Sequence, residues 1–309
     1  AGRGGMGAPL IATEGGTGGE GVAPAGSTAP RTDPLSALGS FRASFWMLTI
    51  CCICVYGCVL PFNNVASSLL MERTYFRPNP DGCALSEPNS CESVTNQPNG
   101  SACLIDDSYA PPLPMNVTIG GKRYAPLRPS DVDCTSTVPS QKDLWSGNQS
   151  CTRIFCKRQK AAETKATQVM TVPYIISAVS SPFLGFVIDR YGGRALIAAL
   201  CPVLLVGAHL LLAYSQISPM LPLVGQGVAY AVFGAALWPS VPFTVPAAYE
   251  GLAYGLVTAV QNAGLGGIPL LLSAVYDASS QRYIPNAELL FVGLAAMGLA
   301  AGGGLWLFL

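Results

Sequence analysis

Charged residues are scarce in this chain, and their scarcity excludes an ordinary soluble domain. Of the 309 residues, 11% are Asp, Glu, Lys or Arg and 50% are apolar, whereas a soluble domain carries about a quarter charged residues. Long stretches between Val169 and Leu309 have no ionisable side chain. A helix of about 20 apolar residues crosses the hydrocarbon of a bilayer. The composition therefore predicts an integral membrane protein, and a net charge of zero gives no argument for a nucleic-acid partner.

Histidine is nearly absent, and clusters of reactive side chains are lacking. His209 is the one histidine, and no nucleophile–base pair or metal-ligand cluster has usable spacing. We therefore expect no enzyme activity, metal or cofactor. His209 lies near the end of an apolar segment, where a lone histidine is more often a packing residue than a proton-linked switch. No charged residue is expected deep in the apolar segments, so the sequence offers no proton or ion coupling site.

Apolar segments long enough to span a membrane number six. They cover residues 44–70, 169–188, 195–214, 221–245, 251–276 and 287–309. Short turns between the last five predict antiparallel neighbours. The expected organisation is a disordered cytosolic Gly/Ala/Pro-rich linker over 1–40, a first helix within 41–72, a polar loop over 73–168 and a five-helix remainder over 169–309. Because the chain starts at Ala1 and stops inside an apolar run, we expect a piece of a longer protein.

The polar loop carries the marks of an oxidising, glycosylating compartment. It holds three N-x-S/T sequons, at Asn99, Asn116 and Asn148, and six cysteines, Cys83, Cys91, Cys103, Cys134, Cys151 and Cys156. Six cysteines predict three disulfides whose pairing the sequence does not fix. A zinc site is disfavoured because the loop has no histidine. We expect the loop on the lumenal or extracellular face, which places the 189–194 turn and both chain ends in the cytosol.

Polar and aromatic side chains recur on single faces of three spans. Residues four, seven or eight positions apart share a helix face, and polar groups in hydrocarbon are costly unless they face protein or a cavity. We predict that these faces line a water-accessible cavity and contact a substrate. The alternative is that they form hydrogen bonds between packed helices. The candidate residues are Tyr56, Asn63, Tyr230, Trp238, Tyr254, Thr258, Gln261 and Asn262.

A short charged turn, G-F-V-I-D-R-Y-G-G-R from Gly185 to Arg194, joins the second and third spans. An arginine can pair with the acid across this turn, and such a charge latch can hold one conformation and release it in another. The alternative is a plain interfacial turn with snorkelling arginines. The G-x-x-x-D-R-x-G-x-R spacing favours the latch. Its candidate residues are Gly185, Asp189, Arg190, Gly192 and Arg194.

Several segments resemble one family of transporters. The charged turn is typical of the major facilitator superfamily. Segments 60–70, 174–190, 236–246 and 251–265 resemble the carboxy-terminal half of its lysosomal dipeptide transporters. The resemblance implies an all-α membrane fold in which this chain supplies helices seven to twelve of twelve. It also implies uniport of short peptides, a glycosylated lysosomal accessory protein as partner, and Trp238, Gln261 and Asn262 as cavity residues.

The sequence therefore predicts half of a membrane transporter that moves small polar solutes, dipeptides above all, across the lysosomal membrane by alternating access. The expected partners are the solute, membrane lipid and the missing amino-terminal half of the transporter. Two alternatives remain open. One keeps the fold and changes the solute to a sugar or an organic anion. The other is a non-transporting membrane glycoprotein whose lumenal loop binds a partner.

Overall fold

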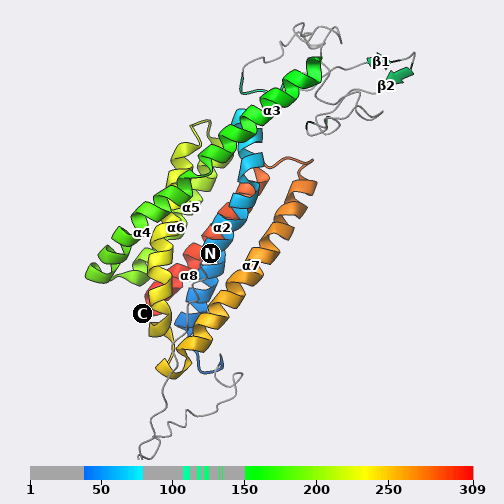
Figure 1. Ribbon diagram of the computed structural model, residues 1–309. Coiled ribbons are helices and arrows are strands. Elements are labelled where there is room, and N and C mark those ends of the chain that lie inside the picture. The colour runs from blue at the N-terminus through cyan, green and yellow to red at the C-terminus, as the bar shows by residue number, and fades with distance from the viewer. Residues whose placement is uncertain are drawn as a thin grey trace, which may run out of the picture.

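The computed structural model describes residues 38–78, 107–111, 117–119, 122–124, 132, 134 and 150–308. Within this part of the chain, six helices are long and apolar enough to cross a membrane (Figure 1). The predicted all-α membrane fold with six spans is confirmed. The elements are α2 (Ala43–Leu70), η1 (Met71–Tyr75), β1 (Val117–Ile119), β2 (Lys122–Tyr124), α3 (Ser150–Val169), α4 (Val172–Tyr191), α5 (Arg194–Tyr214), α6 (Met220–Leu237), η4 (Trp238–Thr244), η5 (Ala247–Tyr249), α7 (Glu250–Ala278) and α8 (Asn286–Phe308).

The two ends of the bundle are named here by the connections they carry. The loop end is the end at which α2 and α5 finish and α8 begins, because α2 leads there towards the 73–168 segment (Figure 1). The hairpin end is opposite and carries the turn between α4 and α5. Successive spans alternate in direction, so every span runs from one end to the other.

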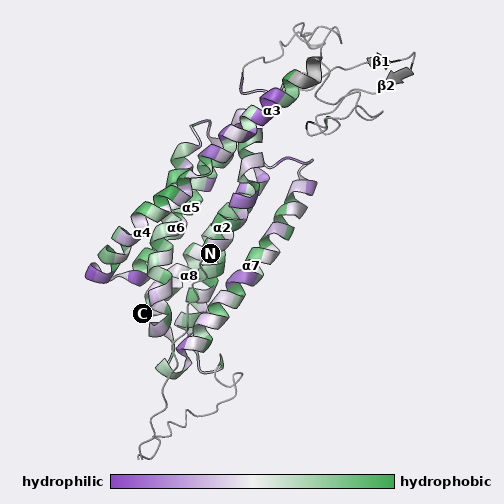
Figure 2. Ribbon diagram, viewed as in Figure 1, coloured by the Kyte–Doolittle hydropathy of each residue, from purple (hydrophilic) through white to green (hydrophobic). Residues whose placement is uncertain are grey.

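Helix α3 lies inside the 73–168 segment that the sequence predicted as a polar loop, and the sequence analysis did not predict this helix. The stretch A-A-E-T-K-A after Lys160 consists mostly of good helix formers, but it is too polar to register as a span (Figure 2). Only Met170 and Thr171 separate α3 from α4, so the two form a nearly continuous rod. The short antiparallel pair β1–β2, with Val117 opposite Tyr124, was also not predicted.

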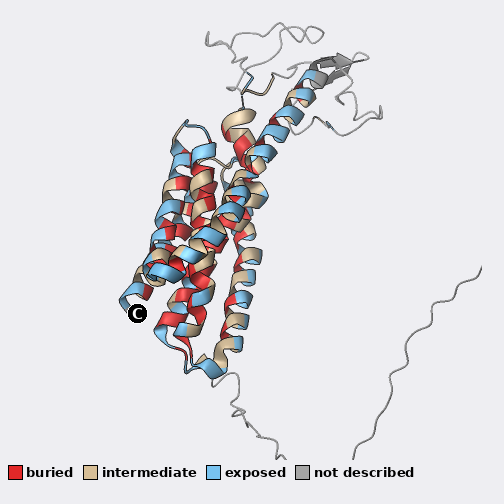
Figure 3. Cartoon of the chain, turned by 60° about the vertical axis from the view of Figure 1, so that its left-hand side comes forward, coloured by how far each residue is buried: buried red, intermediate tan, exposed pale blue. Residues whose placement is uncertain are grey.

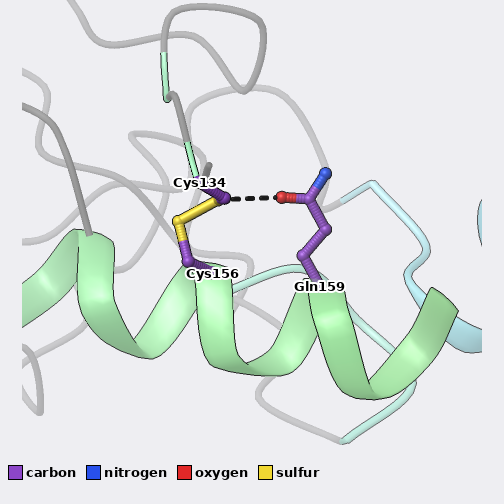
Figure 4. The surroundings of a disulfide bond; sticks show 3 residues. All are labelled: Cys134, Cys156 and Gln159. Carbon is purple, nitrogen blue, oxygen red and sulfur yellow. Dashed lines mark hydrogen bonds between the residues drawn. A yellow bond between two sulfur atoms is a disulfide. The ribbon is translucent and has the colours of Figure 1, made fainter. Parts of the chain in front are cut away.

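One predicted disulfide is present, between Cys134 and Cys156 on α3, with Cα atoms 5.3 Å apart (Figure 4). The Oε1 atom of Gln159 lies 3.1 Å from the Cys134 sulfur. A disulfide sulfur carries no hydrogen, so this approach is a contact rather than a hydrogen bond. The remaining cysteines and the sequons are predictions that lie outside the described residues or side chains: Cys83, Cys91, Cys103, Cys151, Asn99, Asn116 and Asn148. Residues 1–37 of the expected linker also lie outside.

Helix α2 is the core of the bundle. Most of its apolar stretch is buried, whereas α4 and α7 leave most of theirs exposed (Figure 3). Small residues allow α7 to approach it closely, because a side chain at Gly57 would collide with Ile268 and one at Gly264 would collide with Ile53. Helices α4 and α7 therefore lie on the outside of the bundle, each with one face against this chain and much of its remaining surface uncovered.

Two charged residues at the loop end are buried, although they lie at the ends of spans rather than deep within them. Glu288 is fully buried and Arg73 is 7% exposed. The Arg73 guanidinium donates hydrogen bonds of 2.8–3.4 Å to the backbone oxygens of Leu211, Leu212, Ser215 and Ile217. It thereby gathers carbonyls at the end of α5 and just beyond it, where helical partners run out. The Glu72 carboxylate accepts bonds from the backbone N–H groups of Tyr283 and Ile284.

Candidate functional site

A cavity of about 530 Å³ lies between α2, α4 and α6 towards the hairpin end. We call it the aromatic cavity, because two tyrosines and a tryptophan contribute to its wall. Its lining residues are Tyr56, Ser177, Ser181, Gly185, Asp189, Tyr230, Ala231, Gly234, Ala235, Trp238 and Pro239. Three of the eight predicted cavity residues, Tyr56, Tyr230 and Trp238, are therefore brought together from α2, α6 and the start of η4.

Hydrogen bonds fix the aromatic side chains relative to one another. The Trp238 indole N–H donates to the Tyr56 hydroxyl oxygen at 3.0 Å, and the Tyr254 hydroxyl donates to the Trp238 backbone oxygen at 3.0 Å. The rings of Trp238 and Tyr254 stack with centroids 6.3 Å apart, and those of Tyr56 and Tyr230 meet edge to face at 5.7 Å. Tyr254 from α7 thus supports this wall from behind. Tyrosine and tryptophan use their polar atoms here as buried aromatic residues commonly do.

Local sequence explains why these helices leave room for a cavity. Ala231, Gly234 and Ala235 form a small-residue surface on α6, and a Cβ atom at Gly234 would stand 3.6 Å from the Tyr56 hydroxyl. Helix α6 then changes to the 3₁₀ segment η4, which contains Pro239 and Pro242. Proline lacks the N–H that an α-helical turn requires, so the helix tightens there. The change of helix type places Trp238 at the rim of the cavity.

Asn63 lies on α2 outside the residues that line the aromatic cavity. Its amide nitrogen donates to the Tyr174 hydroxyl of α4 at 2.9 Å. This contact is the helix-joining role that the sequence left open as an alternative. Tyr174 was missed because an aromatic residue near the start of an apolar segment looks like an ordinary interfacial anchor.

The three remaining candidates lie on α7. Thr258 and Asn262 are exposed and Gln261 is half-buried, and none of them lines the aromatic cavity. They follow Tyr254 along one face at near four-residue spacing, on a flank that little of this chain covers. Their role in a substrate cavity stays a prediction.

The charged turn at the hairpin end contains an ion pair. An Arg194 Nη2 group donates to Asp189 Oδ1 at 2.7 Å. Gly192 and Gly193 adopt φ angles of +72° and +74°, which other residues rarely adopt, so the tight turn requires them. Arg190 is exposed. Gly185 and Asp189 also line the aromatic cavity, so the turn and the cavity share residues.

A second contact links the turn to the cavity wall. The Arg194 guanidinium carbon lies 5.4 Å from the centroid of the Phe243 ring, in a cation–π arrangement. Phe243 belongs to η4, the same segment that begins with Trp238. The ion pair is therefore connected to Trp238 through Phe243 and the η4 segment.

His209 has a partner that the sequence did not reveal. Its Nδ1 atom lies 2.6 Å from Glu288 Oε2, and both side chains are fully buried between α5 and α8. His209 is therefore buried and packed, as the sequence favoured, and its acidic partner is the feature that the sequence did not predict. Glu288 stands at the start of the last apolar segment, where an acidic residue is favoured by the helix dipole. Its position therefore suggested an ordinary interfacial residue and not a partner for His209.

The wall of the aromatic cavity carries groups that are able to bind a small polar solute. Its wall offers hydroxyls, an indole, one carboxylate and aromatic faces. Among the described residues, no group of three or more His, Cys, Asp or Glu side chains is placed to hold a metal ion. Rings and hydroxyls of this kind bind small polar solutes by hydrogen bonds and stacking.

Comparison with known proteins supports the resemblance seen in the motifs. No family model matches the chain. The lysosomal dipeptide transporter MFSD1 of Danio rerio is 33% identical over 155 residues, which cover 50% of this chain and 33% of the relative. The corresponding proteins of Gallus gallus and Homo sapiens are 32% identical over 149 residues and 31% identical over 147 residues, covering 48% and 47% of this chain and 33% and 31% of the relatives. The matches span about a third of the length of these curated relatives. The predicted resemblance to such transporters is confirmed.

Proposed function

We propose that this chain forms one half of a major facilitator transporter that moves dipeptides across the lysosomal membrane by alternating access. The observation that carries the proposal is the aromatic cavity, where Tyr56, Tyr230 and Trp238 converge beside the charged turn. A transporter of this class binds its solute near the middle of the membrane, between two bundles that rock about the site. The dipeptide and the lysosome are taken from the similar proteins, which are lysosomal dipeptide transporters.

The exposed flanks of the bundle support a missing second half. Helices α4 and α7 leave large apolar side chains uncovered, among them Phe183, Phe186 and Leu270, each at least 67% exposed. Helix α4 lines the aromatic cavity, and α7 carries the exposed Asn262. A second six-helix bundle laid on this side would cover the apolar residues and close the cavity. Under this proposal the amino-terminal half of the transporter supplies that bundle.

The turn between α4 and α5 supports alternating access. An ion pair at the surface is weak enough to break and re-form, at about 0–1 kcal/mol. Asp189 and Arg194 form such a pair next to the cavity. We infer that the pair is made in the conformation described here and broken in another. The orientation in the membrane, with this turn on the cytosolic side, is part of the proposal.

Dipeptide flux into liposomes that contain the full-length gene product tests the proposal. Flux of a labelled dipeptide is expected for the unchanged protein and is expected to fall about tenfold or more for Trp238→Ala, because the variant loses both the ring stack and the indole donor. Asn262→Leu tests the α7 face in the same assay. Trp306→Ala is the matched control, since Trp306 is 57% exposed near the end of α8. Equal flux for Trp238→Ala and Trp306→Ala would sink the site assignment.

The rival readings give different results in the same liposomes. Flux of a sugar or an organic anion without dipeptide flux would keep the fold and replace the solute. No flux of any of these solutes, from protein that is folded and correctly sorted, would favour a membrane glycoprotein that does not transport.

A further inference from the structure

A fully buried acid–base pair lies between α5 and α8, outside the aromatic cavity. His209 Nδ1 and Glu288 Oε2 are 2.6 Å apart, and neither side chain has exposed surface. The imidazole stacks on the Phe291 ring with centroids 5.0 Å apart, and the Phe62 ring meets it edge-on at 5.2 Å. The remaining polar atoms, His209 Nε2 and Glu288 Oε1, have no hydrogen-bond partner among the described residues. An ionisable pair inside a span is expensive and usually has a function.

We propose that His209 and Glu288 form a proton-binding site that ties the packing of α5 and α8 to the acidity at the loop end. The site has no opening, so a solute cannot enter it, and a proton is the ligand that its size and chemistry fit. An acid and a base at this distance share a proton in a charge-assisted hydrogen bond. With one shared proton the pair as a whole is neutral. A second proton gives an imidazolium beside a carboxylic acid, with a net positive charge.

The surroundings make this second proton disruptive. A net charge enclosed by apolar side chains is costly because it has lost its hydration. Arg73 and Cys58, both from the α2–η1 segment, lie close enough to interact electrostatically with Glu288. The fixed positive charge of Arg73 disfavours a second positive charge. Helix α6 and the rest of α8 contain no charged residue, and Asp277 and Arg282 near the start of α8 are exposed.

The position of the pair decides which side of the membrane it senses. His209 stands five residues before the end of α5, and Glu288 stands two residues after the start of α8. Both are therefore within about two helical turns of the loop end. Protons reach the pair from that side when the bundle opens briefly, and acid then loosens the contact between α5 and α8. This inference goes beyond the transport proposal and does not depend on it.

Thermal unfolding of the purified full-length gene product in lipid nanodiscs, measured from neutral to acid pH, tests the site. The double variant H209Q/E288Q keeps two polar side chains of similar size but removes both titrating groups. The unchanged protein is expected to lose about 5 °C in transition temperature on acidification in excess of the double variant. Asp277→Asn is the matched control, since it removes an exposed carboxylate outside the pair and the cavity, and it should follow the unchanged protein. A double variant with the same acid dependence as the unchanged protein would overturn the proposal.

Infrared spectroscopy gives a second readout that does not depend on stability. Acidification of the unchanged protein should produce a carbonyl band of a buried carboxylic acid, and the band should be missing in H209Q/E288Q. Persistence of the same band in the double variant would assign it to another carboxyl group and contradict the proposal. Absence of the band in the unchanged protein would contradict it as well.

Discussion

The bundle holds two acid–base pairs with nearly the same separation in opposite surroundings. At the hairpin end, Asp189 and Arg194 are 2.7 Å apart with side chains 68% and 27% exposed. Towards the loop end, His209 and Glu288 are 2.6 Å apart with no exposure at all. Distance alone would rank the two pairs as equal. Solvation separates them, because water competes for the first pair and is excluded from the second.

The difference in solvation gives the two pairs different contributions to stability. An exposed pair contributes about 0–1 kcal/mol, so thermal motion can open it and a ligand in the adjoining cavity can bias it. Loss of one member of a buried pair leaves an uncompensated group and costs about 3–5 kcal/mol. Around the buried pair, Glu72 and Arg73 also hold the connections that follow α5 and α7. The contacts at the loop end are therefore more numerous and more buried than the ion pair at the hairpin end, and the transport proposal places the opening at the hairpin end.

The largest effect is expected at the buried pair. His209→Leu leaves Glu288 buried without its partner and should lower the free energy of unfolding by about 3–5 kcal/mol. The double variant H209L/E288L replaces the pair with apolar side chains and should recover most of that loss, because no charged or polar group then lacks a partner. Denaturant unfolding in lipid nanodiscs at neutral pH measures both. Equal losses for the single and double variants would show that the pair matters only through its packing.

The next effect is expected at Arg73, the buried cation of the loop end. Arg73→Met keeps a long apolar stem but removes the donors to four backbone oxygens at the end of α5. The expected loss is about 1–3 kcal/mol, since the variant removes several charge-assisted hydrogen bonds, one of them buried. Arg190→Met is the control at the hairpin end, where Arg190 is exposed, and it should change stability by less than about 0.5 kcal/mol. Similar losses for the two variants would remove the distinction between the ends.

The spans and the charged turn could be predicted from the sequence because both are local signals. An apolar run of about 20 residues specifies a span by itself, and the predicted ends of five spans lie within three residues of the observed helices. The positive φ angles at Gly192 and Gly193 follow from adjacent glycines in a tight turn. Helix α3 was missed because its residues favour a helix without forming an apolar run. Membrane-span reasoning does not detect such a helix.

Contacts between distant residues could be predicted only where each residue stands out in the sequence by its own pattern. Tyr56, Tyr230 and Trp238 stand out on separate spans by helical spacing, so their convergence could be expected. The pairing of His209 with Glu288 joins residues 79 positions apart, and each reads alone as an ordinary residue near a span's end. Arg73 similarly looks interfacial until the end of α5 is placed beside it. Side-chain partners across the bundle depend on helix packing, which one sequence without packing information does not specify.

A moderate effect is expected in the aromatic cavity, which lies nearer the hairpin end. Tyr56→Phe removes the acceptor for the Trp238 indole N–H and should weaken dipeptide binding about fivefold, which corresponds to about 1 kcal/mol for one hydrogen bond. Tyr214→Phe is the matched control, because Tyr214 is 64% exposed at the loop end. Equilibrium binding of a labelled dipeptide to the full-length gene product measures both. An unchanged Kd for Tyr56→Phe would mean that the bond does not position the tryptophan for a solute.

The smallest effect on stability is expected at the exposed pair. There the comparison between the two ends predicts a change in the rate of dipeptide transport instead. Asp189→Asn should alter the free energy of unfolding by no more than about 0.5 kcal/mol, because the carboxylate is largely solvated. Dipeptide flux should nevertheless change, since the variant weakens the hold on Arg194 and, through Phe243, on the segment that carries Trp238. The charge-exchanged variant D189R/R194D restores opposite charges across the turn and should bring flux back towards the unchanged value. A large loss of stability in Asp189→Asn, or no change in flux, would show that the turn is a fixed support and that the two ends do not differ in the way proposed.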